Sequence, residues 1–120
     1  GVIVIASVKN DVHDIGKNIV IALLETQGYR IIDLGKNVDE HTIVDAAKKY
    51  NADLIALSAL MTTTMAEMPK VVMLAKEHGL RIPVIVGGAV VNKEYADSIG
   101  AYYSKDALDA IESVKKFFGQ

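Results

Sequence analysis

The sequence predicts an α/β fold, a doubly wound five-stranded parallel sheet of the flavodoxin-like or Rossmann-like type. Two observations support this prediction. Apolar runs of about five residues alternate with helical patterns of about a dozen, as in βα units that feed a parallel sheet. The 120 residues, 51% of them hydrophobic, also suit a single core. We therefore expect residues 1–120 to form one domain, with crossover helices on both faces of the sheet.

The first half of the chain predicts three strands and two helices. Residues 2–8 are rich in β-branched residues and apolar on both faces, as in a central strand. A helix over 16–26 follows, and Gly28 ends it. The stripe of this helix that we expect to face the sheet contains Ile15, Ile19, Ala22 and Leu23. Strands at 30–34 and 53–59 flank a helix that Asp39 can cap and whose inner face contains Ile43, Ala46, Ala47 and Tyr50.

The second half continues the pattern. A helix over 64–78 ends at Gly79, and a strand at 83–86 ends at Gly87-Gly88. The remaining elements are a short helix at 92–98, a short strand at 101–103 and a helix at 105–118. The inward residues of the last helix are expected to be Ala107, Leu108, Ile111, Val114 and Phe118.

The composition excludes several partners. A net charge of -2, with no block of like charge, gives no cationic face for nucleic acid. No apolar run reaches the ~18 residues of a membrane span, so we expect no membrane contact. The chain has no cysteine and no signal peptide, and a cytoplasmic location is expected. Its start at Gly1 in a strand-like run suggests that it is cut from a longer polypeptide.

Ligands of doubly wound folds bind beyond the carboxyl ends of the strands, at the switch in strand order. Four loops of unusual composition should meet there, namely residues 10–17, 58–64, 87–89 and 103–104. The loop after the second strand, residues 35–39, looks ordinary. We therefore expect the ligand site between the first four loops.

Asp11 and His13 lie in the first of these loops. A carboxylate near a histidine can hold its Nδ1–H and leave Nε2 free for a metal. The other histidines, His41 and His78, are expected at exposed helix ends, so no zinc ligand set is apparent. A metal inside a macrocycle needs only an axial ligand, which narrows the choice to haem or a corrinoid. A solvated loop in which Asp11 caps the helix explains the same residues.

The other loops are rich in hydroxyls and glycines. One threonine of the run 62–64 can cap a helix, but Ser58 and three threonines exceed that need and fit a polar wall. Gly16 costs a helix about 1 kcal/mol relative to alanine, which suggests either a nearby ligand or close packing of the helix on a strand. Gly87-Gly88 is either a tight turn or part of the crevice.

Other functions of this fold suit these loops poorly. A receiver domain requires an aspartate at the end of the third strand, where this chain has Ser58. A flavin mononucleotide protein would carry a hydroxyl- and glycine-rich phosphate loop after the first strand, and a dinucleotide fold would carry G-x-G-x-x-G there. This chain instead has Lys9-Asn10-Asp11-Val12-His13 at that position.

Three motifs resemble those of a known family. Asp11-Val12-His13-Asp14-Ile15-Gly16, followed by Lys17-Asn18, matches the D-x-H-x-x-G motif of cobalamin-binding domains. Ser58-Ala59-Leu60 matches the S-x-L element of that family, and Gly87-Gly88-Ala89 matches its glycine pair. Along nearly its whole length the chain resembles the cobalamin-binding domain of methionine synthase and of the corrinoid proteins of methyltransferase systems. The residues around His13 resemble the methyl-transferring branch more than the mutase branch.

The resemblance implies a cobalamin or related corrinoid, in methylcobalamin and cob(I)alamin forms, bound base-off with His13 as the lower axial cobalt ligand. It also implies a relay in which Asp11 bonds His13 and Thr64 bonds Asp11, although many relatives have serine at the third position, after a proline. The cofactor-binding residues that it implies are Asp11, Val12, His13, Asp14, Ile15, Gly16, Ser58, Leu60, Thr62, Thr64, Gly87, Gly88, Ala89, Tyr103 and Ser104.

The resemblance further implies a methyl carrier that is not a complete enzyme by itself. Its partners would be methyl-donor and methyl-acceptor methyltransferase domains or subunits, a helical cap domain and a reductive activator. Three alternatives stay open: an adenosylcobalamin mutase domain, a cobalamin-sensing regulatory domain, and a flavodoxin-like scaffold without a cofactor.

Overall fold

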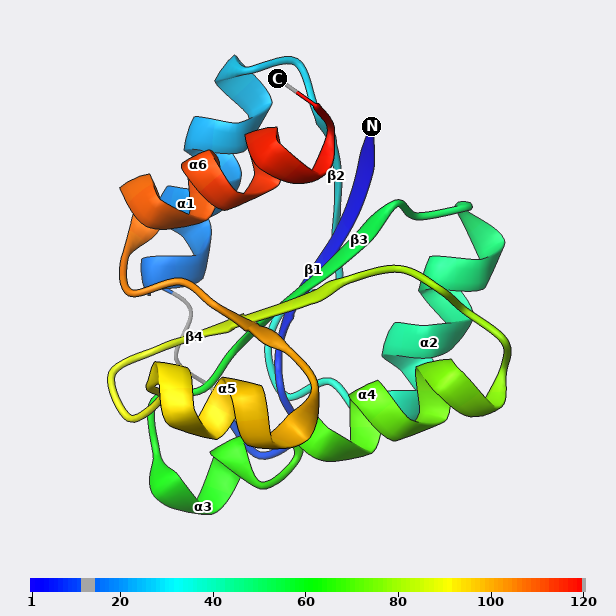
Figure 1. Cartoon of the computed structure of the whole chain (residues 1–120), viewed down its shortest axis with the longest axis vertical. Coiled ribbons are helices and arrows are strands. Elements are labelled where there is room, and N and C mark those ends of the chain that lie inside the picture. Colours follow the sequence, from blue (N-terminus) through cyan, green and yellow to red (C-terminus); the bar gives the residue numbers. More distant parts are fainter. Residues whose placement is uncertain (12–14, 120) are drawn as a thin grey trace.

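The structure, a computed structural model, describes residues 1–11 and 15–119, and these form one parallel sheet of five strands. The strands are β1 (Val2–Ser7), β2 (Arg30–Asp33), β3 (Leu54–Ser58), β4 (Val84–Gly87) and β5 (Tyr102–Tyr103). Their order across the sheet is β2-β1-β3-β4-β5, the order of flavodoxin-like sheets. The predicted fold class is therefore confirmed (Figure 1).

Helices cover both faces of the sheet. They are α1 (Ile15–Thr26), α2 (Glu40–Lys49), α3 (Thr62–Met65), α4 (Met68–Glu77), α5 (Lys93–Ile99) and α6 (Ala107–Phe117). Helices α1 and α6 pack together over one face, while α2, α4 and α5 cover the other (Figure 1). The sheet is thus enclosed between two helical layers, as its apolar strands require.

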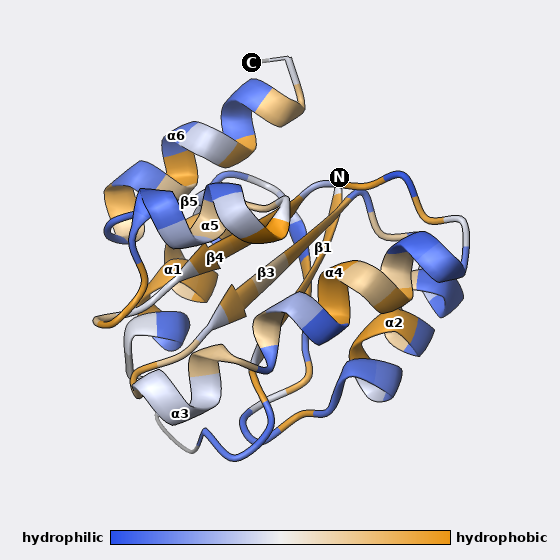
Figure 2. Ribbon diagram, turned by 60° about the horizontal axis from the view of Figure 1, so that its bottom comes forward, coloured by the Kyte–Doolittle hydropathy of each residue, from blue (hydrophilic) through white to orange (hydrophobic). Residues whose placement is uncertain are grey.

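The core has two parts, one on each face of the sheet. Successive residues of β1 alternate between them, because Ile3 belongs to the part under α1 and α6 and Val4 to the part under α2, α4 and α5. In Figure 2 the strands are largely orange, the colour of hydrophobic residues, whereas the helices around them carry both blue and orange residues. The predicted cap of α2 is also present, since Asp39 Oδ1 accepts a hydrogen bond from Thr42 N at 2.8 Å.

The predicted inward stripe of α1 is wrong at Ile19 and Ala22 and correct at Leu23, which packs against the core under α1 and α6. Ile19 is 51% exposed and Ala22 is also exposed, and the helix instead turns Lys17, Val20 and Leu24 toward the protein. This stripe has the same helical spacing, but it begins with a lysine, which the hydrophobic pattern assigns to the surface. In α6, Ile111 and Val114 are buried as expected, whereas Leu108 is 71% exposed.

The single helix predicted over 64–78 is two helices, α3 and α4, separated by Ala66 and Glu67. Pro69 stands in the first turn of α4, where its missing N–H costs no hydrogen bond. A helix continuing through this point would require an N–H from that residue, so the chain begins a new helix. Within the described residues, no helix is long and apolar enough to cross a membrane.

Candidate functional site

The carboxyl ends of β1, β3, β4 and β5 lie at one edge of the sheet. Ser7 pairs with Ser58, and Ser58 pairs with Gly87, so the loops that follow these strands begin side by side. Val86 pairs with Tyr103, which brings the end of β5 to the same edge. The topology therefore gathers the four loops that the sequence singled out.

A cavity of about 340 Å³ opens at this edge, within the ~300–1,000 Å³ of small-molecule sites. The expected site residues that line it are Gly16, Ser58, Leu60, Gly87, Gly88, Ala89, Tyr103 and Ser104. Thr62 lies exposed on α3 and does not line the cavity. Val12, His13 and Asp14 lie outside the described residues, as does the side chain of Ile15.

Asp11 and Thr64 do not line the cavity; both are buried, and Asp11 bonds Leu60, which does line it. Asp11 Oδ2 accepts a hydrogen bond from Leu60 N at 2.7 Å and another from Thr64 Oγ1 at 2.8 Å. Thr64 Oγ1 also lies 3.0 Å from Met61 O, but one hydroxyl proton serves one acceptor well, and the carboxylate is the stronger. The segment after β3 thus orients the carboxylate that stands two residues before His13. Thr64 occupies the position that the relay requires.

The glycine pair is explained by close backbone packing. Gly88 has φ +124°, and a Cβ there would lie 2.8 Å from Ala59 C, with the carbonyl oxygen of Ala59 closer still. A Cβ on Gly87 would lie 3.1 Å from Ser104 O. These contacts bring the loops after β3 and β4 together at the wall of the cavity.

Gly16 has the opposite environment. A Cβ at this position would meet no atom of the described residues within 4 Å, so close packing of the helix on a strand does not explain the glycine. Because Gly16 lines the cavity, the open space beside it is available to a ligand. Because Gly16 has no side chain, it leaves this part of the cavity open.

Ser104 is the clearest sign of a missing binding partner within the described part of the chain. It is 5% exposed, and its Oγ is buried without a hydrogen-bond partner among the described residues. Burying an unsatisfied hydroxyl costs about 1–3 kcal/mol, so such groups usually bond a ligand or water. Since Ser104 lines the cavity, a polar atom of a bound ligand can satisfy it. The residues present fit a ligand with a polar group buried at this position.

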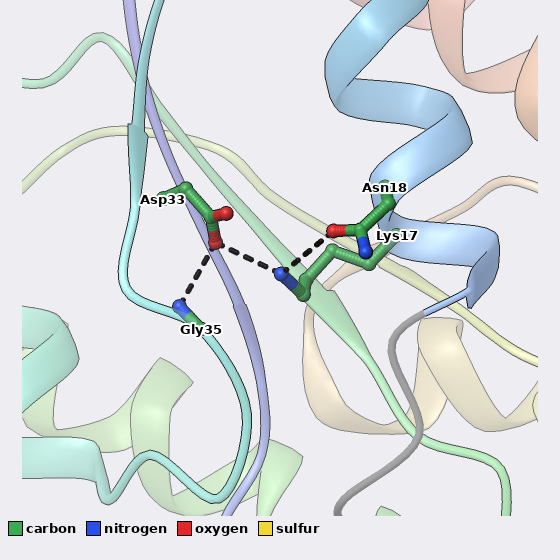
Figure 3. A network of polar contacts seen from close by, with 4 residues as sticks. All are labelled: Lys17, Asn18, Asp33 and Gly35. Atoms are coloured by element: carbon green, nitrogen blue, oxygen red, sulfur yellow. Dashed lines mark hydrogen bonds and ion pairs between the residues drawn. The ribbon is translucent and has the colours of Figure 1, made fainter.

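Sequence reasoning missed two contributors to the site. Lys17 lines the cavity although its side chain is only 1% exposed, and its Nζ donates to Asp33 Oδ1 at 2.8 Å (Figure 3). The loop over 35–39 was expected to be ordinary, yet Asn37 N donates to Asp11 O at 2.8 Å. The sequence has no signal for either, because a hydrophobic pattern assigns lysine to the surface and because nearly every residue has a backbone N–H.

The sequence model of the B12 binding domain matches residues 1–112. The chain belongs to the B12-binding domain family. This membership confirms the predicted corrinoid cofactor, and the fold, the cavity and the unsatisfied Ser104 hydroxyl agree with it. The expectation that His13 binds cobalt is not tested by this membership, because His13 lies outside the described residues.

Curated relatives of this B12-binding domain are corrinoid proteins of methanogens. The chain is 46% identical to dimethylamine corrinoid protein 2 of Methanosarcina acetivorans over 119 residues, which are 97% of this chain and 55% of that protein. It is 42% identical to trimethylamine corrinoid protein 1 of Methanosarcina mazei over 118 residues, or 96% of this chain and 55% of that protein. The chain thus spans little more than half the length of these relatives.

The structure of this chain is similar to solved structures of cobalamin-related proteins. A cobalamin-binding protein from Desulfitobacterium hafniense DCB-2 matches with a TM-score of 0.94 and 36% identity, over 98% of this chain and 58% of that one. A chain of the methanol:cobalamin methyltransferase complex MtaBC from Methanosarcina barkeri also matches with a TM-score of 0.94 and 36% identity, over 100% of this chain and 47% of that one. The predicted resemblance to corrinoid proteins of methyltransferase systems is confirmed.

Proposed function

We propose that this B12-binding domain carries a methyl group on a corrinoid between methyltransferase partners. Supporting evidence comes from relatives named for dimethylamine and trimethylamine and from a structural neighbour in a methanol system. Because domains like this one occur with different methyl donors, we assign donor choice to the partner and methyl carriage to this domain. A helical cap domain and a reductive activator complete the proposed set of partners.

The observation that carries the proposal is the buried Asp11 carboxylate. Leu60 N and Thr64 Oγ1 both donate to its Oδ2, so the group is oriented from the segment after β3. In this proposal His13 would hold the cobalt through Nε2 and would donate Nδ1–H to Asp11. When bound, the corrinoid supplies a cobalt atom that can accept and release a methyl group. Thr64 and Leu60 N limit rotation of the carboxylate and thereby favour one orientation of the imidazole.

The cavity is assigned to the buried tail of the corrinoid. Ser104 Oγ has no partner among the described residues and offers a hydrogen bond to a polar atom of the tail. Gly16 leaves space on the side of α1, and Gly87-Gly88 brings backbone to the opposite wall. The protein residues therefore bind and orient the cofactor and exclude water from its buried part.

The visible absorption spectrum of the cobalamin-loaded protein tests the axial role. We expect a histidine-ligated, base-off spectrum for the wild type and loss of that ligation in His13→Ala. His41→Ala is the matched control, because His41 is an exposed histidine on α2, with 72% of its side chain accessible. A His13→Ala spectrum identical to that of the wild type, or no binding of cobalamin by the wild type, would contradict the proposal.

Ser104→Ala is expected to separate binding from stability. The substitution removes a buried hydroxyl that has no partner in the described part of the chain, so the free energy of unfolding of the cofactor-free protein should stay the same or rise slightly. Cobalamin affinity should fall about tenfold, the value of one hydrogen bond to the tail. Urea unfolding and a cobalamin titration measure the two effects. Unchanged affinity would show that Ser104 makes no bond to the cofactor.

A further inference from the structure

The segment between β2 and α2 makes polar contacts with both sides of residues 12–14. On the amino-terminal side, Asn37 N donates to Asp11 O at 2.8 Å, and Asn37 Oδ1 accepts from Asn10 N at 2.8 Å. The same segment bonds the end of β1, because Gly35 O accepts from Ser7 N at 2.9 Å. The chain that leads into Asp11 is therefore fastened to this segment by main-chain and side-chain bonds.

Two of these residues adopt an uncommon backbone conformation. Asn10 has φ +69° and Asn37 has φ +56°, both in the left-handed region that side chains other than glycine seldom adopt. Such conformations persist where surrounding bonds hold them, and they concentrate at functional sites. Here the two left-handed asparagines bond each other, so each stabilises the conformation of the other.

On the carboxyl-terminal side, the contact is an ion pair. Lys17 Nζ is buried and donates to Asp33 Oδ1 at 2.8 Å, and Gly35 N donates to the same oxygen at 2.9 Å (Figure 3). A lysine ammonium is seldom buried without a paired charge. Asp33 thus fixes the first turns of α1 against the end of β2, and Gly35 N fixes the carboxylate that does so.

We propose that residues 33–37, here called the β2 bracket, position the loop that carries the cobalt ligand. The inference rests on the proposed function, because the loop in question contains His13. Asp33 and Asn37 do not line the cavity, and their polar contacts are with Asn10, Asp11, Lys17 and Gly35. We therefore attribute an effect of either on cobalt ligation to the residues that they hold. The bracket fixes Asn10 and Asp11 before the ligand and Lys17 after it. Its members are positioning residues that act on the orientation of His13.

A double-mutant cycle on the ion pair tests the inference. The cobalamin dissociation constant and the histidine-ligated fraction of bound cobalamin are measured for the wild type, Lys17→Met, Asp33→Ala and the double variant. Each single variant should weaken binding about tenfold and lower the ligated fraction, the usual scale for outer-shell partners of a metal ligand. The double variant should be no worse than either single variant, because both remove the same contact.

Further variants separate positioning from folding. Asn37→Gly tolerates the positive φ and keeps the backbone donor, but it removes the acceptor for Asn10 N, so the ligated fraction should fall without loss of the fold. Asp33→Asn retains an oxygen for Gly35 N but leaves the buried Lys17 ammonium without a counter-charge, so it should lower the ligated fraction nearly as far as Asp33→Ala does. Lys93→Met is the matched control, since it breaks the exposed Lys93–Asp97 pair on α5 and should change neither quantity.

The outcomes distinguish this inference from the proposed function. If the wild type is histidine-ligated and Asp33→Ala and Asn37→Gly retain the full ligated fraction, the bracket is excluded while the proposed function stands. If Lys17→Met alone has an effect, Lys17 contacts the corrinoid directly and the bracket is again excluded. A wild type without histidine ligation overturns the proposed function, and the inference with it.

Discussion

Gly88→Ala is expected to lower the free energy of unfolding by about 3 kcal/mol, from a strained positive φ together with overpacking. Gly88 has φ +124°, and its new methyl group would overlap the backbone carbonyl of Ala59. Ala59 is fully buried, and its N–H bonds Gly87 O at 3.1 Å, so neither chain can move away without breaking a contact between the loops. Urea unfolding of the cofactor-free protein measures this loss.

Gly16→Ala is the matched control for that prediction. Among residues 1–11 and 15–119, no atom lies within 4 Å of the added methyl group, and Gly16 is helical, so stability should be equal or higher by about 0.5–1 kcal/mol. The same methyl group enters the cavity and should weaken cobalamin binding. Equal stability of the Gly88→Ala and wild-type proteins would contradict the backbone contact, whereas unchanged cobalamin affinity in Gly16→Ala would show that the ligand does not use this space.

The strands could be predicted because their signal is local. The run at 2–8 is apolar on both faces, and only a strand covered by helices on both sides accommodates such a run. Because parallel strands with helical crossovers allow few topologies, the order of the sheet followed from the same pattern. The gathering of residues 58–60 and 87–89 at one edge followed in turn from the sheet. This part of the site is a consequence of topology.

The phase of α1 could not be predicted because it depends on a distant partner. Lys17 turns inward only since Asp33, at the end of β2, accepts its charge. Judged by hydrophobicity alone, Ile19 is the better candidate for that face, yet it is 51% exposed. A hydrophobic pattern assigns every lysine to the surface, and a paired buried lysine violates that rule.

The hydrogen bond from Asn37 N to Asp11 O could not be predicted from the sequence either. Its backbone N–H bonds Asp11 O, and any residue except proline has such a donor. The positive φ of Asn37 is compatible with an asparagine but is not implied by one. Supporting residues of this kind become apparent only when the loops after β1 and β2 are placed side by side.

Asp11→Ala is expected to have the second large effect, a loss of about 2–3 kcal/mol in the free energy of unfolding, because two donors lose an acceptor in a buried place. Leu60 N and Thr64 Oγ1 both donate to Asp11 Oδ2. Thr64 Oγ1 can turn to Met61 O, 3.0 Å away, and recover part of its bond. Leu60 N donates to Asp11 Oδ2 and to no second acceptor among the described residues, so we expect it to account for most of the loss.

Two further variants assign this effect to its cause. Asp11→Asn keeps an oxygen that can accept both bonds, so it should cost less than about 1 kcal/mol while removing the charge. Thr64→Val keeps the shape of the side chain and removes one donor, so the free energy of unfolding should fall by about 1 kcal/mol.

The histidine-ligated fraction of bound cobalamin is measured for the same variants, in addition to urea unfolding. If ligation falls in Asp11→Asn as far as in Asp11→Ala, the charge of Asp11 orients His13; if it falls only in Asp11→Ala, the hydrogen-bonded shape of the side chain is sufficient. An Asp11→Ala protein as stable as the wild type would contradict the assigned bonds.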